Sequence, residues 1–136
     1  MATVFLGGTC NGSQWRERLK PLLTVSYFDP VVEDWDEVAQ QRELHERQTA
    51  DYVLYVITPK MTGVYSIAEA ADDGNKRPAS TLFCVLGEDG DGGFAPAQFK
   101  SLQQVMLLVC KNGAKGFYSL GTVAHFLNSC ATDSAR

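Results

Sequence analysis

Residues 50–78 have the sequence ADYVLYVITPKMTGVYSIAEAADDGNKRP. The run Tyr52–Ile57 is apolar and rich in β-branched and aromatic residues, so it predicts a buried strand that ends at the Thr-Pro pair after it. A helical pattern then begins at Ser66 and carries Glu69 in its first turn. This stretch therefore encodes a strand, a loop and the start of a helix, in that order.

Glu69 is the acidic residue of this helix start. In open α/β sheets, ligands bind at the edge where strands end and helices begin, and helix N-termini favour negative charge. The pattern thus predicts an ionised Glu69 carboxylate at a ligand-binding edge, as a candidate nucleophile. The same residues also fit a capping box, in which Ser66 and Glu69 each bond to the other's backbone amide. Taken alone, the motif favours the cap, because capping boxes are common and nucleophilic glutamates are rare.

The rest of the chain continues the alternation of strands and helices. Further strands are predicted at Thr3–Leu6, Thr24–Phe28, Ser80–Leu86 and Val105–Cys110, and further helices at Gln14–Leu23, from an Asp34 cap to Thr49, at Pro96–Gln104 and at Tyr118–Asn128. Continuous apolar strands joined by helical crossovers indicate a parallel sheet with helices on both faces. We expect one α/β domain over residues 1–136, a three-layer sandwich with a five-stranded parallel sheet in the flavodoxin-like order 2-1-3-4-5 and a frayed tail at 131–136.

In this topology the loops 7–13 and 58–66 meet at one crevice, because the strand order reverses between the first and third strands. The first loop has two glycines that permit close backbone approach and three short polar side chains: Gly7, Gly8, Thr9, Asn11 and Ser13. Such a loop suits a phosphate or a sugar, yet it matches neither the P-loop nor the dinucleotide-binding fingerprint. A tight strand-to-helix turn is an equally good interpretation.

Composition excludes several classes of protein. The chain has a net charge of −4 and a pI of about 5.1, so it offers no basic field for long nucleic acid. It contains no apolar run of membrane-spanning length, and its first residues do not resemble a signal peptide, so we expect no membrane partner and a cytoplasmic location. Four scattered cysteines form no C-x-x-C pair, so no metal site is predicted: Cys10, Cys84, Cys110 and Cys130.

The helix that ends at Thr49 carries charges expected to face solvent. Glu43 and Arg47 are spaced for a favourable i,i+4 pair on its surface. Trp35 and Tyr65 are suited to stacking a base, although core packing is the default for Trp35.

An ordered set of motifs resembles the nucleoside 2-deoxyribosyltransferase superfamily, and within it the small nucleoside 2-deoxyribosyltransferase-like proteins. These motifs are Phe5–Thr9 (FLGGT), Trp15–Glu17 (WRE), Asp29 with Pro30, Ala50–Ile57 (ADYVLYVI), and the stretch from Gly63 through Glu69 to Pro78. The set spans most of the chain.

The resemblance implies a role for several residues. The glutamate after the third strand, here Glu69, attacks the anomeric carbon of a 2-deoxyribosyl group, and an upstream acidic residue, here Glu43, helps hold the substrate. Gly7, Gly8, Thr9, Asn11, Tyr65 and Ser66 are then the expected substrate contacts. Such a reaction passes through a glycosyl ester that water or a second base opens, with no metal or redox cofactor. A homodimer or larger homo-oligomer is also implied.

Three departures from the family pattern bear on the reaction. Phe5 stands where the transferases carry a tyrosine, Ala70 and Ala71 replace a glycine that commonly follows the glutamate closely, and residues 63–66 lack an acidic residue. These departures weaken transfer between free nucleosides and favour hydrolysis of a nucleotide or binding without turnover.

Three functions therefore remain open from the sequence. The first is an N-glycosidic enzyme that acts on 2-deoxyribonucleosides or their 5′-monophosphates through Glu69. The second is a nucleotide-binding module in which Glu69 is only a helix cap. The third is a glycohydrolase of NAD or of a nucleotide signal.

Overall fold

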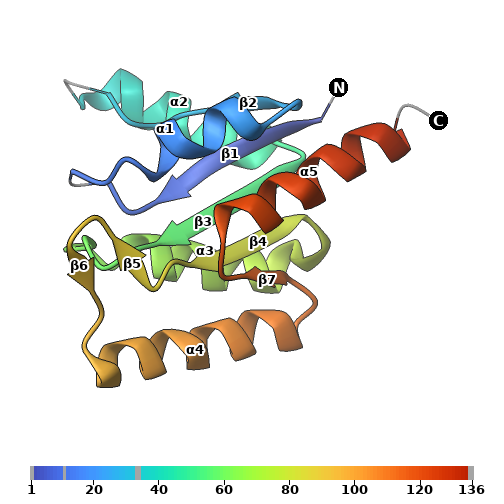
Figure 1. Cartoon of the computed structure of the whole chain (residues 1–136). Coiled ribbons are helices and arrows are strands. Elements are labelled where there is room, and N and C mark those ends of the chain that lie inside the picture. Colours follow the sequence, from blue (N-terminus) through green and yellow to red (C-terminus); the bar gives the residue numbers. More distant parts are fainter. Residues whose placement is uncertain (1, 11, 33–34, 135–136) are drawn as a thin grey trace.

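A computed structural model describes residues 2–10, 12–32 and 35–134 of the chain (Figure 1). Its centre is a sheet of five parallel strands in the order β2-β1-β3-β4-β7. The strands are β1 (Thr3–Gly8), β2 (Ser26–Phe28), β3 (Tyr52–Ile57), β4 (Thr81–Val85) and β7 (Lys115–Phe117). Since β7 is the fifth strand of this sheet along the chain, the predicted parallel α/β sheet is confirmed, with an order that corresponds to the predicted 2-1-3-4-5.

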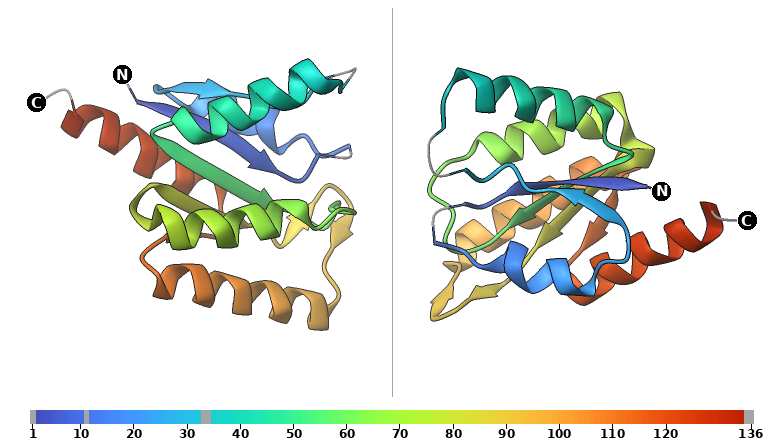
Figure 2. Two further views of the ribbon diagram at one scale, coloured as in Figure 1. Left: turned by 180° about the vertical axis from the view of Figure 1, so that it is seen from behind. Right: turned by 90° about the horizontal axis from the view of Figure 1, so that it is seen from above.

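Helices cover both faces of the sheet (Figure 2). One face carries α1 (Trp15–Leu19), the short 3₁₀ turn η1 (Lys20–Leu22) and α5 (Leu120–Ser134); the other carries α2 (Glu37–Thr49), α3 (Tyr65–Lys76) and α4 (Pro96–Lys111). A second 3₁₀ turn, η2 (Pro78–Ser80), precedes β4, and a hairpin of β5 (Glu88–Asp89) and β6 (Gly92–Gly93) follows it. The expected three-layer architecture is thereby confirmed.

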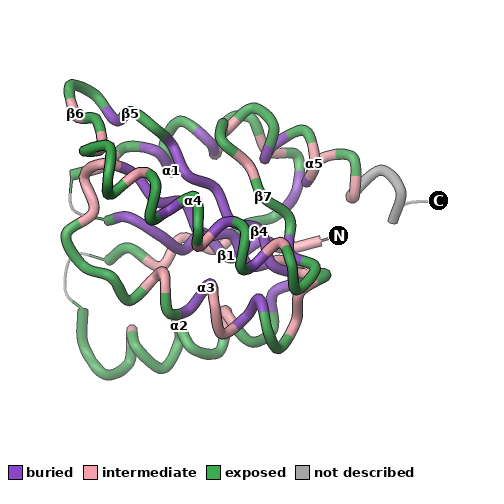
Figure 3. The backbone as a smooth tube through the Cα atoms, turned by 90° about the horizontal axis from the view of Figure 1, so that it is seen from below, coloured by how far each residue is buried: buried purple, intermediate pink, exposed green. Residues whose placement is uncertain are grey.

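Burial is concentrated in the central strands, and it differs strongly among the helices (Figure 3). Five of the six residues of β3 are buried, which explains its continuous apolar sequence. By contrast, all 13 residues of α2 are described and none of them is buried. The helix α2 therefore lies at the rim of the fold, where its side chains line surfaces and cavities rather than the core. No helix in the described part of the chain is both long and apolar enough to cross a bilayer.

The strand predicted at Val105–Cys110 is wrong, because these residues belong to α4. Leu102, Met106 and Val109 are buried at helical spacing, whereas Leu107 and Leu108 are 71% and 56% exposed. An apolar run this short fits a helix and a strand equally well, so its period could not decide between them. The true edge strand, β7, contains one large apolar residue and gives no signal of a buried strand.

Other elements differ from prediction mainly at their ends. The helix predicted at Gln14–Leu23 is split into α1 and η1, and α5 starts at Leu120 and continues to Ser134. The predicted cap Asp34 lies outside the described residues, and Asp36 caps α2 by accepting from the Ala39 amide at 2.8 Å. Of the predicted tail, 131–134 belong to α5, and 135–136 lie outside the described residues.

Substitutions on the buried and the exposed face of α4 should have different effects on stability. Leu107→Lys is expected to change the free energy of unfolding by no more than about 0.5 kcal/mol, since its side chain faces solvent. Val109→Ala, on the buried face, should cost roughly 1–3 kcal/mol. Urea unfolding of the two variants measures both values; a larger loss for Leu107→Lys than for Val109→Ala would contradict the helical packing.

Candidate active site

Two adjoining cavities lie at the carboxyl ends of β1 and β3. The larger, of about 320 Å³, we call the glutamate cavity, because Glu69 lines it together with Glu43 and Trp35. The smaller, of about 240 Å³, we call the loop cavity; it is lined by residues of the first loop and by the segment from Ile57 to Ser66. Both cavities share Gly8, Cys10, Tyr65 and Ser66 in their walls. The two loops predicted to meet at one crevice do so.

The structure brings most of the predicted site residues together. Gly7, Gly8, Glu43, Tyr65, Ser66 and Glu69 line the glutamate cavity, and Gly8, Thr9, Tyr65 and Ser66 line the loop cavity. Asn11 lies outside the described residues.

Gly7 and Gly8 are required by close packing against β3. A Cβ atom on Gly7 would lie 2.8 Å from the Tyr55 ring, and one on Gly8 would lie 2.1 Å from the Val56 carbonyl oxygen. Gly8 also has a φ of 123°, in the region that favours glycine. These glycines therefore let the floor of both cavities approach the neighbouring strand.

Thr9 and Ser13 use their hydroxyls to hold the loops in place. The Thr9 hydroxyl accepts from the Thr58 amide at 3.0 Å, which joins the two loops. Ser13 donates to Asp89 at 2.5 Å, and Lys60 lies 3.9 Å from the same carboxylate. Burial alone would raise the pKa of Asp89, but its hydrogen bonds and the nearby cations hold that pKa below its ordinary value. Asp89 thus anchors the β5–β6 hairpin to the first loop.

The capping box predicted at Ser66 is wrong. The helix α3 starts one residue earlier, at Tyr65, with Val64 as its N-cap, and no side chain among the described residues caps it. Ser66 is therefore inside the helix and lines the cavities, and Glu69 lies in the second turn. The alternative that Glu69 serves as a helix cap loses its structural basis.

Glu69 is nearly buried, with 8% of its surface exposed. Burial raises the pKa of its carboxyl to about 7; Arg47 lowers this pKa, while Glu43 and Asp73 raise it. Burial thus opposes the ionised state that the sequence predicted for Glu69 at a helix start. At neutral pH this carboxyl is divided between its two protonation states.

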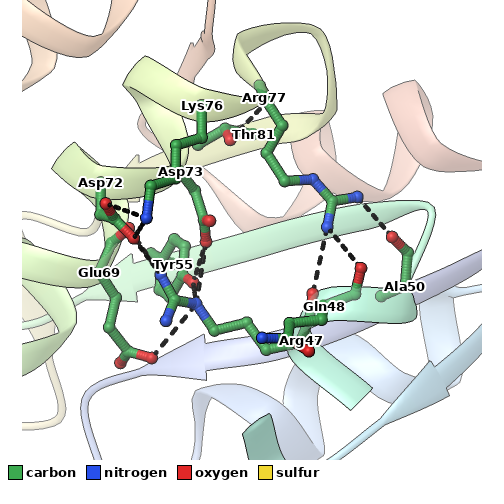
Figure 4. A network of polar contacts seen from close by, with 10 residues as sticks. All are labelled: Arg47, Gln48, Ala50, Tyr55, Glu69, Asp72, Asp73, Lys76, Arg77 and Thr81. Atoms are coloured by element: carbon green, nitrogen blue, oxygen red, sulfur yellow. Dashed lines mark hydrogen bonds and ion pairs between the residues drawn. The ribbon is translucent and has the colours of Figure 1, made fainter. Parts of the chain in front are cut away.

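Arg47 faces Glu69 at the centre of a polar network (Figure 4). Its Nε lies 2.9 Å from the Tyr55 hydroxyl, 3.0 Å from Asp73 Oδ2 and 3.5 Å from Glu69 Oε2. A second nitrogen of the same guanidinium bonds Asp72 at 3.2 Å. The predicted surface pair of Glu43 with Arg47 is wrong, since Arg47 turns towards α3 and Glu43 instead accepts from Trp35 Nε1 at 3.3 Å.

Sequence reasoning missed Arg47, Tyr55 and Asp73. One signal was present: Glu69 and Asp73 are spaced i,i+4 and so lie on one face of α3. Ala70, beside Glu69 in sequence, is fully buried, so this face packs against the sheet. Two acidic residues on an inward face require a cation nearby, and α2 supplies it through Arg47.

Two exposed aromatic side chains stand at the mouth of the glutamate cavity. Trp35 is 59% exposed and Tyr65 is 69% exposed, so the expected core packing of Trp35 is wrong. Phe5 is buried and stacks on Phe28 with ring centroids 6.0 Å apart. On the neighbouring strand, the Tyr55 hydroxyl lies 2.9 Å from Arg47 Nε.

Together, a parallel sheet and an acidic, aromatic-rimmed cavity at its strand-order reversal define an α/β protein with a small-ligand site. The sequence model of the family described as nucleoside 2-deoxyribosyltransferase like matches residues 1–85, from β1 to the end of β4, and the chain belongs to this family. Comparisons with curated proteins and with solved structures found no match. The family relates the chain to enzymes of glycosyl transfer and N-glycoside cleavage, which act on small nucleoside substrates.

Proposed function

We propose that the protein cleaves the N-glycosidic bond of 2-deoxyribonucleosides or their 5′-monophosphates, with Glu69 as the nucleophile. The observation that carries this proposal is the position of Glu69: a nearly buried carboxylate that caps no helix, lines a cavity of about 320 Å³ and faces one arginine at 3.5 Å. Burial of a carboxylate destabilises the folded state, so a buried carboxylate that lines a cavity points to a functional role rather than a structural one.

The proposed reaction consumes only the substrate and either water or an acceptor base. A Glu69 oxygen bonds to C1′ as the bond between C1′ and the base nitrogen breaks, and the bonding electrons leave with the base, which takes a proton from solvent. Water then attacks C1′, its hydroxyl stays on the sugar, its proton returns to solvent and Glu69 leaves as a carboxylate. If a second base attacks in place of water, the outcome is transfer.

In the proposed complex, each cavity would hold a different part of the substrate. The base would lie between the exposed rings of Trp35 and Tyr65, where stacking is favourable, with Glu43 at the same wall. The sugar would lie over Glu69, and its 5′ group would enter the loop cavity. The described lining of the loop cavity carries no charged side chain, but it includes Tyr65 and Ser66 at the start of α3, whose amides suit a phosphate.

This proposal is tested with a panel of substrates. The protein is incubated with each 2-deoxyribonucleoside, each 5′-monophosphate, the ribonucleosides and NAD, with and without an acceptor base, and free base is measured by chromatography. We expect base release from deoxyribosyl substrates, with kcat/KM at least about tenfold higher for the monophosphates because the phosphate gains charge-assisted hydrogen bonds. A new nucleoside in the presence of acceptor base would identify transfer.

Two other results would assign a different function to the protein. Ligand binding by calorimetry without base release from any substrate would leave a nucleotide-binding module. Release from NAD alone would assign the site to a larger substrate.

A further inference from the structure

Arg47 is the cation that faces Glu69 in the described part of the chain, yet it gives its shortest contacts to other groups. We propose that Arg47 is a positioning residue for the reaction: it favours the ionised form of the Glu69 carboxylate and holds this carboxylate at the cavity wall, while leaving its oxygens free to attack. This inference deepens the proposed function and rests on it.

Three elements fix the position of Arg47 (Figure 4). Arg47 projects from α2, Asp73 from α3 and Tyr55 from β3, and the Tyr55 hydroxyl donates to Asp73 at 2.6 Å. Burial, and then the bond to Asp73, raises the pKa of Tyr55 far above its ordinary value, so this hydroxyl stays protonated and remains a donor. The guanidinium is therefore held by two partners that do not depend on Glu69.

The distance between Arg47 and Glu69 suits a nucleophile. At 3.5 Å the pair is ionic, and no hydrogen bond between the two side chains is formed in the described structure. A strong hydrogen bond would stabilise the carboxylate and so lower its reactivity, whereas an ionic contact favours the charged form and leaves the oxygen lone pairs accessible.

The network also fits the charge change of the reaction. When Glu69 becomes an ester it loses its charge, and a half-buried arginine with no other partner would then be destabilising. Arg47 retains the carboxylates of Asp73 at 3.0 Å and Asp72 at 3.2 Å throughout. Arg47 therefore stays paired in the intermediate.

Removing the charge of Arg47 should change the ionisation of Glu69 in a known direction. The groups that face Glu69 are Arg47 and Glu43 from α2, Asp73 from α3 and Tyr55 from β3. Glu43 and Asp73 disfavour the charged form, and Arg47 opposes them. Without the arginine charge, the carboxyl of Glu69 should lose its proton at a higher pH.

The experiment follows the Glu69 carboxyl carbon by NMR in protein labelled with ¹³C at glutamate side chains, with Glu69→Gln to assign the signal. In Arg47→Gln and Arg47→Met the titration midpoint should rise by about one pH unit or more, and in Arg47→Lys it should stay within about half a unit of the unsubstituted protein. For base release at pH 7, kcat should fall about fivefold or more in both neutral variants, with KM changed less than about threefold.

Arg77→Met is the matched control. Arg77 also ties α3 to the end of α2, by donating to the carbonyls of Arg47, Gln48 and Ala50, but it is not among the groups that face Glu69. Its loss should lower stability and leave the Glu69 midpoint unchanged. Arg47→Gln keeps a hydrogen-bond donor for Asp73, so it can be used if Arg47→Met does not fold.

An unchanged Glu69 midpoint in a folded neutral variant overturns the proposal. The NMR readout needs no turnover, so it remains decisive if no substrate releases base and the proposed function fails. Conversely, base release by a protein whose midpoint does not move would refute the role of Arg47 while leaving the nucleophile in place.

Discussion

Glu69→Gln is expected to reduce base release by at least about 10³-fold. Glutamine has nearly the same size and can occupy the same cavity wall, but its amide is a poor nucleophile and cannot carry the negative charge that attacks C1′. Initial rates of base release on the preferred substrate measure the effect. Rapid quenching followed by mass spectrometry should also detect a glycosyl adduct on the peptide that contains Glu69, and the variant should lack it.

The matched control is Glu37→Gln, which makes the same chemical change on an exposed residue in the first turn of α2. Its rate should equal that of the unsubstituted protein within about twofold, since surface substitutions away from a site have small effects. A Glu69→Gln rate within about threefold of the unsubstituted protein would mean that water or another residue attacks the sugar.

The fold could be predicted where sequence pattern and burial agree. The bounds of β3 were predicted as Tyr52–Ile57 and match, because a strand buried on both faces must be apolar throughout. The run at 105–110 was misassigned, since two of its leucines, Leu107 and Leu108, are exposed on a helix. An apolar run predicts buried residues, but Leu107 and Leu108 are exposed to solvent.

The site could be predicted where the topology alone brings residues together. A parallel sheet with reversal between β1 and β3 places the first loop and the start of α3 at one edge, so the position of Gly8, Tyr65 and Glu69 at this edge could be predicted from sequence. The contacts of Arg47 depend on how α2 packs beside α3, and no local pattern determines that. For the same reason the protonation of Glu69 could not be predicted, because it depends on burial by residues distant in sequence.

The substitution that removes activity should also stabilise the protein at high pH. Burial raises the pKa of Glu69 from 4.5 to about 7, so the folded state holds this proton more tightly than the unfolded chain. Well below pH 4.5 the Glu69 carboxyl is neutral in the folded and the unfolded state, so it does not lower the free energy of unfolding. Between pH 4.5 and about 7 the unfolded chain ionises first and stability falls, and above about 7 the loss is complete. A shift of this size corresponds to a loss of up to about 3 kcal/mol.

Glutamine cannot ionise, so Glu69→Gln should escape this loss. Urea unfolding, followed by the fluorescence of the buried Trp15, should give the variant an advantage of up to about 3 kcal/mol near pH 8.5 and almost none near pH 4.5. An advantage that is the same at both pH values would assign the effect to packing rather than charge. A less stable variant at high pH would mean that the ion pair with Arg47 outweighs the burial of Glu69. The expected result instead indicates that the fold retains a destabilising carboxylate for its reactivity, which is the trade-off between stability and activity typical of catalytic groups.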